Sequence, residues 1–147
     1  MIQALNFIKR FVAVALVVLG LTLIAQNPSY AGGIPQGDWT LTSLNGQPAL
    51  EETQITIKFD SDDESSGKVS GSGGCNLYFA GYSTREPGQI QIGPIGSTFR
   101  GCQDPIIEQE AKYFRALGSV QNYEVGDSTL SLTNSEDTKL VFSAVPQ

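Results

Sequence analysis

The sequence predicts an α+β fold that is mostly β, a curved antiparallel sheet or partial barrel of about seven to eight short strands with one packed helix at about 105–117. Two observations predict it. Short segments that alternate apolar and polar residues recur along the chain, separated by turns rich in Gly, Pro, Asn and Asp. One stretch between the N-terminal and C-terminal groups of these segments has apolar residues at helical spacing instead.

The first 31 residues have the pattern of a secretory signal peptide. The basic pair Lys9-Arg10 precedes a largely apolar run at 11–25, and Ser29-Tyr30-Ala31 places small residues at the −3 and −1 positions of a cleavage site. Cleavage after Ala31 leaves residues 32–37 as a flexible N-terminus and 38–145 as the folded domain. The alternative is a membrane anchor, although the run is shorter than the ~20 apolar residues of a spanning helix.

The charge balance limits the partners. The chain has 15 Asp and Glu residues against 9 Lys and Arg, and the predicted signal peptide contains no acidic residue, so the mature chain is more acidic still. No run of basic residues forms a patch for nucleic acid. We therefore expect a periplasmic or secreted monomer that binds no nucleic acid and has no stable membrane insertion after cleavage.

The strands follow from period-two alternation. The clearest runs from Thr53 to Phe59, where Ile55, Ile57 and Phe59 point to one side. In the segment 75–82, either Leu77 and Phe79 or their neighbours face inward. The other expected strands or extended segments are also short and bounded by turn residues, at 39–44, 68–70, 89–92, 95–99, 120–125, 129–133 and 139–145.

The helix has start and stop signals. Asp104 is expected as the N-cap, with Pro105 at the first helical position. Gly118 suits the position just after the last turn. The expected buried face consists of apolar residues at spacings of three and four: Ile107, Ala111, Phe114 and Leu117.

Cys75 and Cys102 are the only cysteines. In an exported chain they meet an oxidising compartment, and two cysteines allow one intramolecular pairing, so a disulfide is the favoured interpretation. It would close a loop of about 28 residues and stabilise the fold by about 3.5 kcal/mol in the chain-entropy model. Two free thiols are the alternative.

The chain lacks the residues of several common active sites. It contains no histidine, which excludes a Ser-His-Asp triad, a Cys-His dyad and histidine-bound metals. No phosphate-binding P-loop is present. The acidic cluster Asp60, Asp62, Asp63 and Glu64 is interpreted as a solvated hairpin loop, because it does not follow the calcium-loop pattern. No metal, cofactor or catalytic residue is predicted.

The motif Gly71-Ser72-Gly73-Gly74-Cys75-Asn76, followed by Thr98-x-x-x-Cys102, resembles the META domain family, also called HslJ-like. The resemblance extends from Trp39 to Phe142 and marks Gly71, Gly73, Gly74, Cys75, Asn76 and Thr98 as motif residues. Further pieces agree with it in order: Trp39-x-Leu41, Ile57-x-Phe59, Gly81-Tyr82, Ile90-x-Ile92-Gly93-Pro94-Ile95, Glu110, Phe114, Leu117, Tyr123, Leu130-x-Leu132 and Leu140-Val141-Phe142.

We expect the glycine-rich stretch to begin a strand that passes close to the segment 98–102, with Asn76 hydrogen-bonded to nearby backbone. This interpretation makes the motif an architectural centre rather than a phosphate loop or a reactive-cysteine site.

The resemblance implies a small mixed β fold with one helix. Members of the family are often exported or envelope proteins, and some are linked to heat shock, antibiotic tolerance, virulence or secretion. No enzymatic activity is established for the family, so no catalytic residue carries over. We expect a non-enzymatic domain that binds an envelope protein or an apolar ligand. A purely structural envelope module is the alternative, and a carboxylate-dependent hydrolase is less favoured because no carboxylate pair stands out.

Overall fold

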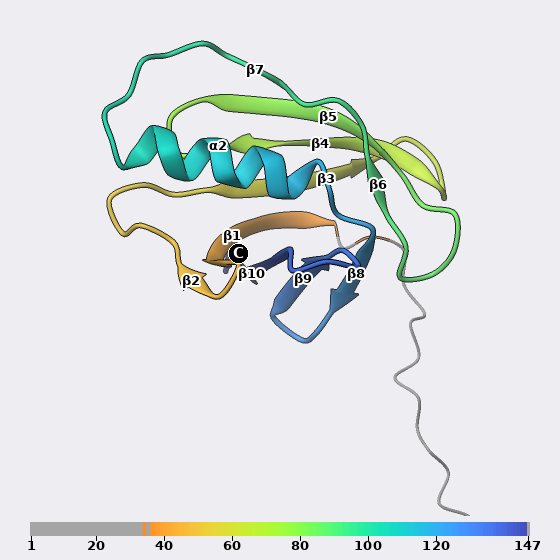
Figure 1. Ribbon diagram of the computed structural model, residues 1–147. Helices are drawn as coiled ribbons and strands as arrows, with labels where there is room; N and C mark the ends of the chain where they lie inside the picture. The colour runs from red at the N-terminus through yellow and green to blue at the C-terminus, as the bar shows by residue number, and fades with distance from the viewer. Residues whose placement is uncertain (1–33, 35, 147) are drawn as a thin grey trace, which may run out of the picture.

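The computed structural model describes Ile34 and residues 36–146, which form an antiparallel sheet coiled almost into a barrel around one helix (Figure 1). The predicted α+β, mostly β class is therefore confirmed. The predicted signal peptide at 1–31, its cleavage site and part of the predicted flexible N-terminus at 32–37 lie outside the described residues.

Ten strands form the sheet in the described part of the chain, eight of them along one path in the order β6-β5-β4-β3-β1-β10-β9-β8. Every pairing is antiparallel, and β2 and β7 pair with β1 and β5 beside that path. The strands are β1 (Gly37–Leu44), β2 (Gln47–Pro48), β3 (Thr56–Ser61), β4 (Ser66–Ser72), β5 (Leu77–Ser83), β6 (Gln91–Ile92), β7 (Gly96–Ser97), β8 (Asn122–Val125), β9 (Thr129–Thr133) and β10 (Lys139–Ala144).

The two ends of the path meet along a seam. The N–H of Ile90 donates to the carbonyl of Gln121 at 3.0 Å, and the N–H of Tyr123 donates to the carbonyl of Gly88 at 2.8 Å. Past the Ile90–Gln121 bond, in the direction of β7 and the helix, no backbone hydrogen bond among the described residues crosses the seam. From there one side continues into β7 and the other leads back to the helix, so the barrel is closed over only part of its length.

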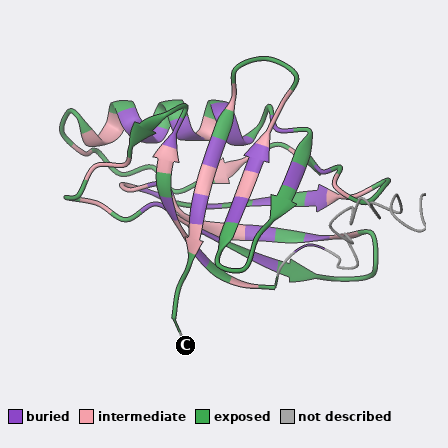
Figure 2. Cartoon of the chain, turned by 90° about the horizontal axis from the view of Figure 1, so that it is seen from below, coloured by how far each residue is buried: buried purple, intermediate pink, exposed green. Residues whose placement is uncertain are grey.

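The core lies between the concave face of the sheet and the helix. Figure 2 shows buried and exposed residues alternating along the strands. Ile55, Ile57 and Phe59 are all buried, as predicted. On β5 the neighbours Tyr78, Ala80 and Tyr82 face inward, which leaves Leu77 and Phe79 outside.

The helix α2 (Ile106–Leu117) packs inside the curve of the sheet, where Tyr113 contacts both halves. Its ring centroid lies 5.7 Å from that of Tyr78 on β5 and 6.4 Å from that of Phe142 on β10. The predicted apolar face is confirmed at Leu117, which is buried, and at Phe114, which is partly buried and packs against the core. It is wrong at Ala111, which is exposed, and Ile107 is only partly buried. The buried residues are Gln109, Glu110, Tyr113, Ala116 and Leu117.

The predicted N-terminal end of the helix also needs correction. Pro105 occupies the N-cap and no side chain caps the helix, so Asp104 is not the cap. The carbonyl of Gln103 already accepts from the N–H groups of Ile106 and Ile107, which satisfies the first free amides. At the other end Gly118 follows the last helical residue, as predicted, with a right-handed φ of −70°.

Candidate functional site

The glycine motif packs around Glu110, a carboxylate buried on α2. Its Oε2 accepts hydrogen bonds from the backbone N–H groups of Cys75 (3.0 Å) and Asn76 (2.6 Å), and its Oε1 accepts from the Asn76 Nδ2 (2.7 Å). Hydrogen bonds to a charged acceptor are short and strong. Glu110 therefore binds the start of β5 to the helix.

Asn76 connects this helix contact to the next segment of the chain. Its Oδ1 accepts from the backbone N–H of Arg100 at 2.7 Å and from the Thr98 Oγ1 at 3.0 Å. The Thr98 Oγ1 in turn accepts from the N–H of Leu77 at 3.1 Å. The buried side chain of Asn76 thus holds three segments together, which is the backbone role expected for it.

The glycines of the motif are required by close packing and by backbone conformation. A Cβ at Gly73 would stand 2.6 Å from the Cζ of Phe114 and 2.7 Å from the Oε2 of Glu110. A Cβ at Gly71 would fall 2.1 Å from the carbonyl oxygen of Thr56. Gly74 has φ +105°, which side-chain-bearing residues rarely adopt. The motif is therefore explained by the approach of strand and helix.

Cys75 and Cys102 form a disulfide, as the sequence predicts, with their Cα atoms 6.1 Å apart. No cysteine is free in the described residues. The bond ties the start of β5 to the loop that leads into α2, beside the Asn76–Glu110 contacts. With both sulfurs in the bond, neither is a thiolate nucleophile.

A second buried polar pair, Tyr78 and Tyr113, lies further along the same buried face of the helix. The Tyr78 hydroxyl donates to the carbonyl of Thr56 at 2.9 Å, so the Tyr113 hydroxyl donates to that of Tyr78 at 2.7 Å. Burial raises the pKa of Tyr78 well above its ordinary value, and burial beside Tyr78 raises the pKa of Tyr113 likewise. Both hydroxyls stay protonated at neutral pH and serve packing rather than acid–base chemistry.

The acidic cluster predicted as a solvated loop lies at the β3–β4 hairpin and is exposed. Asp63 accepts hydrogen bonds from the backbone N–H groups of Ser65 and Ser66, and these lower the pKa of its carboxyl. Within the described residues no group of three or more His, Cys, Asp or Glu side chains is arranged to hold a metal ion. No helix there is long and apolar enough to cross a membrane.

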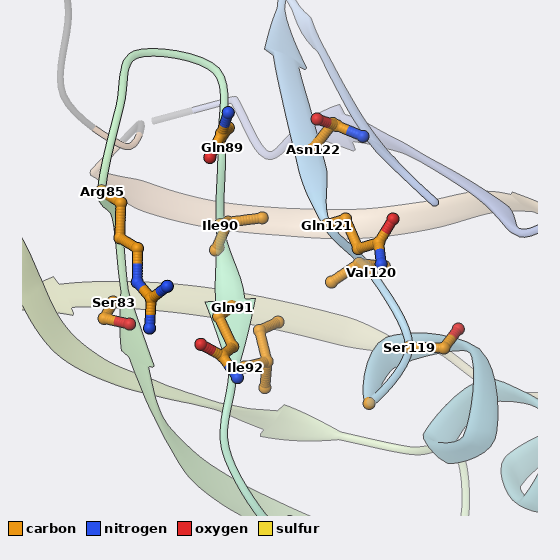
Figure 3. A pocket seen from close by; sticks show the side chains of 11 residues that line it. Ser83, Arg85, Gln89, Ile90, Gln91, Ile92, Ser119, Val120, Gln121 and Asn122 are labelled. Carbon is orange, nitrogen blue, oxygen red and sulfur yellow. The ribbon is translucent and has the colours of Figure 1, made fainter. Parts of the chain in front are cut away.

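Two adjoining hollows lie along the seam. The first, of about 610 Å³, is lined by residues of the segments 83–92 and 118–122 (Figure 3). The second, also about 610 Å³, lies between the segment 91–97 and the residues of α2 and its end at 114–119. Both are lined by Gln91, Ile92, Gly118 and Ser119, so we treat them as one and call it the seam groove.

The seam groove is lined mostly by polar side chains and contains two cations. Its apolar lining includes Ile92, Ile95 and Phe114. Arg85 lines the first hollow and Arg115 the second, and no carboxylate is among the described residues that line them. Neither arginine forms an ion pair within the described residues. The one salt bridge there joins Lys58 and Asp60. In an acidic protein this groove is locally positive.

Other surface features are smaller or more open. A hollow of about 290 Å³ lies where β2 meets the start of α2, lined in part by Leu44, Pro48 and Pro105. On the outer face Leu77 and Phe79 are 64% and 67% exposed, and Phe99 is fully exposed. They form an apolar surface near the disulfide, with the Phe79 ring lying against Gly96.

The sequence therefore predicted which residues form the motif, but it did not predict the seam groove. Every motif residue from Gly71 to Thr98 lies in the region around Glu110 and the disulfide, as described above. The groove is formed by segments that are distant in the chain, at 83–97 and 114–122. One signal was present in the sequence, because the short strand ending at Ile92 is broken by Gly93-Pro94 and so has an interrupted edge.

A nearly closed antiparallel barrel that holds one helix and a disulfide defines a class of small β domains. Within this class the chain belongs to the META domain family, whose model matches residues 33–147. No curated protein matches the chain significantly.

Two solved structures share the fold. A protein from Burkholderia xenovorans, determined by NMR, is 21% identical, with a TM-score of 0.62 over 76% of this chain and 83% of that one. A second NMR structure is 19% identical, with a TM-score of 0.57 over 74% of this chain and 89% of that one. At these identities the likeness extends to the fold alone.

Proposed function

We propose that this protein is an exported, non-enzymatic META domain that binds a protein segment or an apolar ligand in the cell envelope, in connection with stress tolerance or secretion. The observation that carries the proposal is the seam groove, a hollow that the fold leaves open and that polar side chains line together with Ile92, Ile95 and Phe114. Ligand sites are typically concave, and their polar groups orient the ligand beside apolar side chains.

Several features support the export and non-enzymatic parts of the proposal. The N-terminal 31 residues have the signal-peptide pattern, and a disulfide persists in oxidising compartments. The chain has no histidine, and no two carboxylates line any of the three hollows described above. The buried polar groups around Glu110 are all used in hydrogen bonds that hold the fold.

The groove can be blocked by a single substitution. Gly118 lines both hollows and has a right-handed conformation, and a Cβ placed there has no contact closer than 3.4 Å. Gly118→Trp therefore fills the groove with little strain. Gly101→Trp is the matched control, since a Cβ at Gly101 meets nothing within 4 Å and that loop lies away from the groove.

The experiment compares wild type and both variants, each immobilised and exposed to envelope extracts of the source cells grown with and without heat stress. We expect wild type and Gly101→Trp to retain the same protein or lipid, identified by mass spectrometry, and Gly118→Trp to lose it. Equal retention by all three variants would contradict the groove as the site. If wild type retains nothing and a deletion strain has normal stress and drug sensitivity, a purely structural envelope module becomes the better description.

A further inference from the structure

We infer that the seam groove takes an extended, acidic peptide segment, which adds as a strand to the edge formed by β6 and β7. This inference rests on the proposed function and specifies its ligand. It is carried by three features of the groove: unpaired backbone groups on one wall, an arginine in the lining of each hollow, and an opposite wall made by the helix and its end.

The first unpaired edge position is Ile92. The N–H of Gly93 donates to Gly81 on β5 at 2.8 Å, and the N–H of Ile90 donates across the seam to Gln121 at 3.0 Å. Successive residues of a strand direct their backbone groups to opposite sides. The N–H and carbonyl of Ile92 therefore face away from β5, on the seam side, at the point where the hydrogen bonds to the β8 side have ended.

The second edge position is Ser97. The N–H of Thr98 donates to the carbonyl of Leu77 at 2.9 Å, so the N–H and carbonyl of Ser97 face away from β5. Between Ile92 and Ser97 the edge has one extra residue, because Tyr82 pairs with Ile92 whereas Phe79 pairs with Gly96. The edge is thus irregular in the middle and has an outward-facing donor and acceptor at each end.

An unpaired edge beside a hollow is the geometry of β-strand addition. Edge strands present N–H and carbonyl groups to which another extended chain pairs about 4.8 Å away. Domains that bind peptides in this way obtain affinity from the main chain and specificity from pockets for alternate side chains. Here Phe114 and Gly118 form the opposite wall, and the hollow continues past Ile92 toward Arg85.

The charges select an acidic occupant. Arg85 lines one hollow of the groove and Arg115 the other, and the residues that line both hollows include no Asp or Glu. Glu86 has a carboxylate beside the groove, and it accepts a hydrogen bond from the side chain of the lining residue Gln89 at 2.9 Å. An acidic peptide would place carboxylates at the two arginines, whereas a basic peptide would meet like charge.

The probe is a phage-displayed library of random ten-residue peptides, selected on protein purified from cells that express the full-length chain. Enriched peptides are then synthesised with a fluorophore and titrated by anisotropy. We expect enrichment of sequences that combine Asp or Glu with β-branched residues. Arg85→Glu and Arg115→Glu should each weaken binding of such a peptide about threefold to fivefold, as for exposed ion pairs.

Two substitutions of Ser97 test the backbone contacts. The exposed side chain of Ser97 makes no hydrogen bond to the described residues, so replacing it removes no side-chain contact there. Ser97→Pro removes the outward N–H and no ladder bond to β5, and an edge strand tolerates proline at such a position. It should weaken binding about tenfold. Ser97→Ala keeps the N–H and should bind within about twofold of wild type. Thermal unfolding of both variants checks that the edge remains folded.

Three results would overturn the inference: no peptide enriched over a Gly118→Trp counter-selection, enrichment of basic peptides, or equal affinity of Ser97→Pro and wild type. These failures are distinguishable from failure of the proposed function. If the peptides fail but an envelope ligand is still lost on Gly118→Trp, the groove is a binding site for another class of ligand. If the envelope ligand is also unaffected by Gly118→Trp, both proposals fall.

Discussion

The backbone N–H of Asn76 lies 2.6 Å from the buried Oε2 of Glu110, 34 positions further along the chain. This contact joins the glycine motif to the single helix in the described residues. The carboxylate accepts three hydrogen bonds there, from two backbone N–H groups and one amide side chain. A charge buried in this way is tolerated because its hydrogen bonds replace those of water.

Removing this carboxylate should destabilise the fold strongly. Glu110→Ala leaves buried N–H groups at Cys75 and Asn76 without an acceptor, and each such loss costs about 1–3 kcal/mol. We expect a decrease of about 3 kcal/mol in the free energy of unfolding, measured with urea. Glu110→Gln keeps one amide oxygen and should cost less, about 1–2 kcal/mol. Glu108→Ala, on the exposed side of the same helix, is the control and should change stability little; an equal loss there would contradict the assignment.

Gly73 should be intolerant of even one extra carbon. Gly73→Ala places a methyl group against Phe114 and Glu110, at 2.6 and 2.7 Å, and overpacking of this kind costs about 1–3 kcal/mol. Gly101→Ala adds the same group where nothing lies within 4 Å and should stay within about 0.5 kcal/mol of wild type. Denaturation midpoints of the two variants provide the comparison. Similar midpoints would mean that the strand and helix are not in contact at Gly73.

The disulfide should contribute measurably to stability through the loop that it closes. Replacing both Cys75 and Cys102 with serine frees a loop with a sequence separation of 27, and the chain-entropy model gives a loss of about 3.5 kcal/mol. Dithiothreitol should lower the midpoint of wild type and leave the double variant unchanged. Peptide mapping of the unreduced protein should find the two cysteines linked, and two alkylatable thiols would refute the pairing.

Alkaline pH should unfold the protein through Tyr78 and Tyr113. Burial raises the pKa of both hydroxyls above the ordinary 10.0, so the unfolded state releases its protons first. Their contribution to stability is therefore complete below pH 10 and is lost as the pH rises further, at about 2 kcal/mol per pH unit for the pair. Urea midpoints between pH 8 and 11 test this, with tyrosinate absorbance followed in parallel. Tyr113→Phe should reduce the slope, and an unchanged slope would assign the effect to other groups.

Much of the architecture could be predicted from local patterns. The alternation of Ile55, Ile57 and Phe59 fixed one strand and its buried face, because period-two alternation follows directly from strand geometry. The Gly-Gly-Cys-Asn motif likewise indicated where two segments meet, since small residues allow close approach. The disulfide followed from having two cysteines in a chain with the pattern of export.

What could not be predicted depends on tertiary partners. The helix directs Glu110 and Gln109 inward because the backbone N–H groups of Asn76 and Leu50 donate hydrogen bonds to their side-chain oxygens, and hydrophobicity alone cannot show that. Leu77 and Phe79 remain outside because Tyr78 finds partners inside. The seam groove exists only once segments from both halves of the chain come together, so no single stretch encodes it.

The pairing of β1 with β10 has a consequence for synthesis of the chain. Trp39 pairs with Ala144 and Leu44 with Leu140, so one edge of the first described strand is completed only by the last. A ribosome must release nearly the entire polypeptide before this pair can form. Until then β1 is paired with β3 on its other side, and the β6-β5-β4-β3-β1 half of the sheet lacks the three C-terminal strands that cover the rest of the core. The complete barrel can therefore form only after synthesis of the chain is nearly finished.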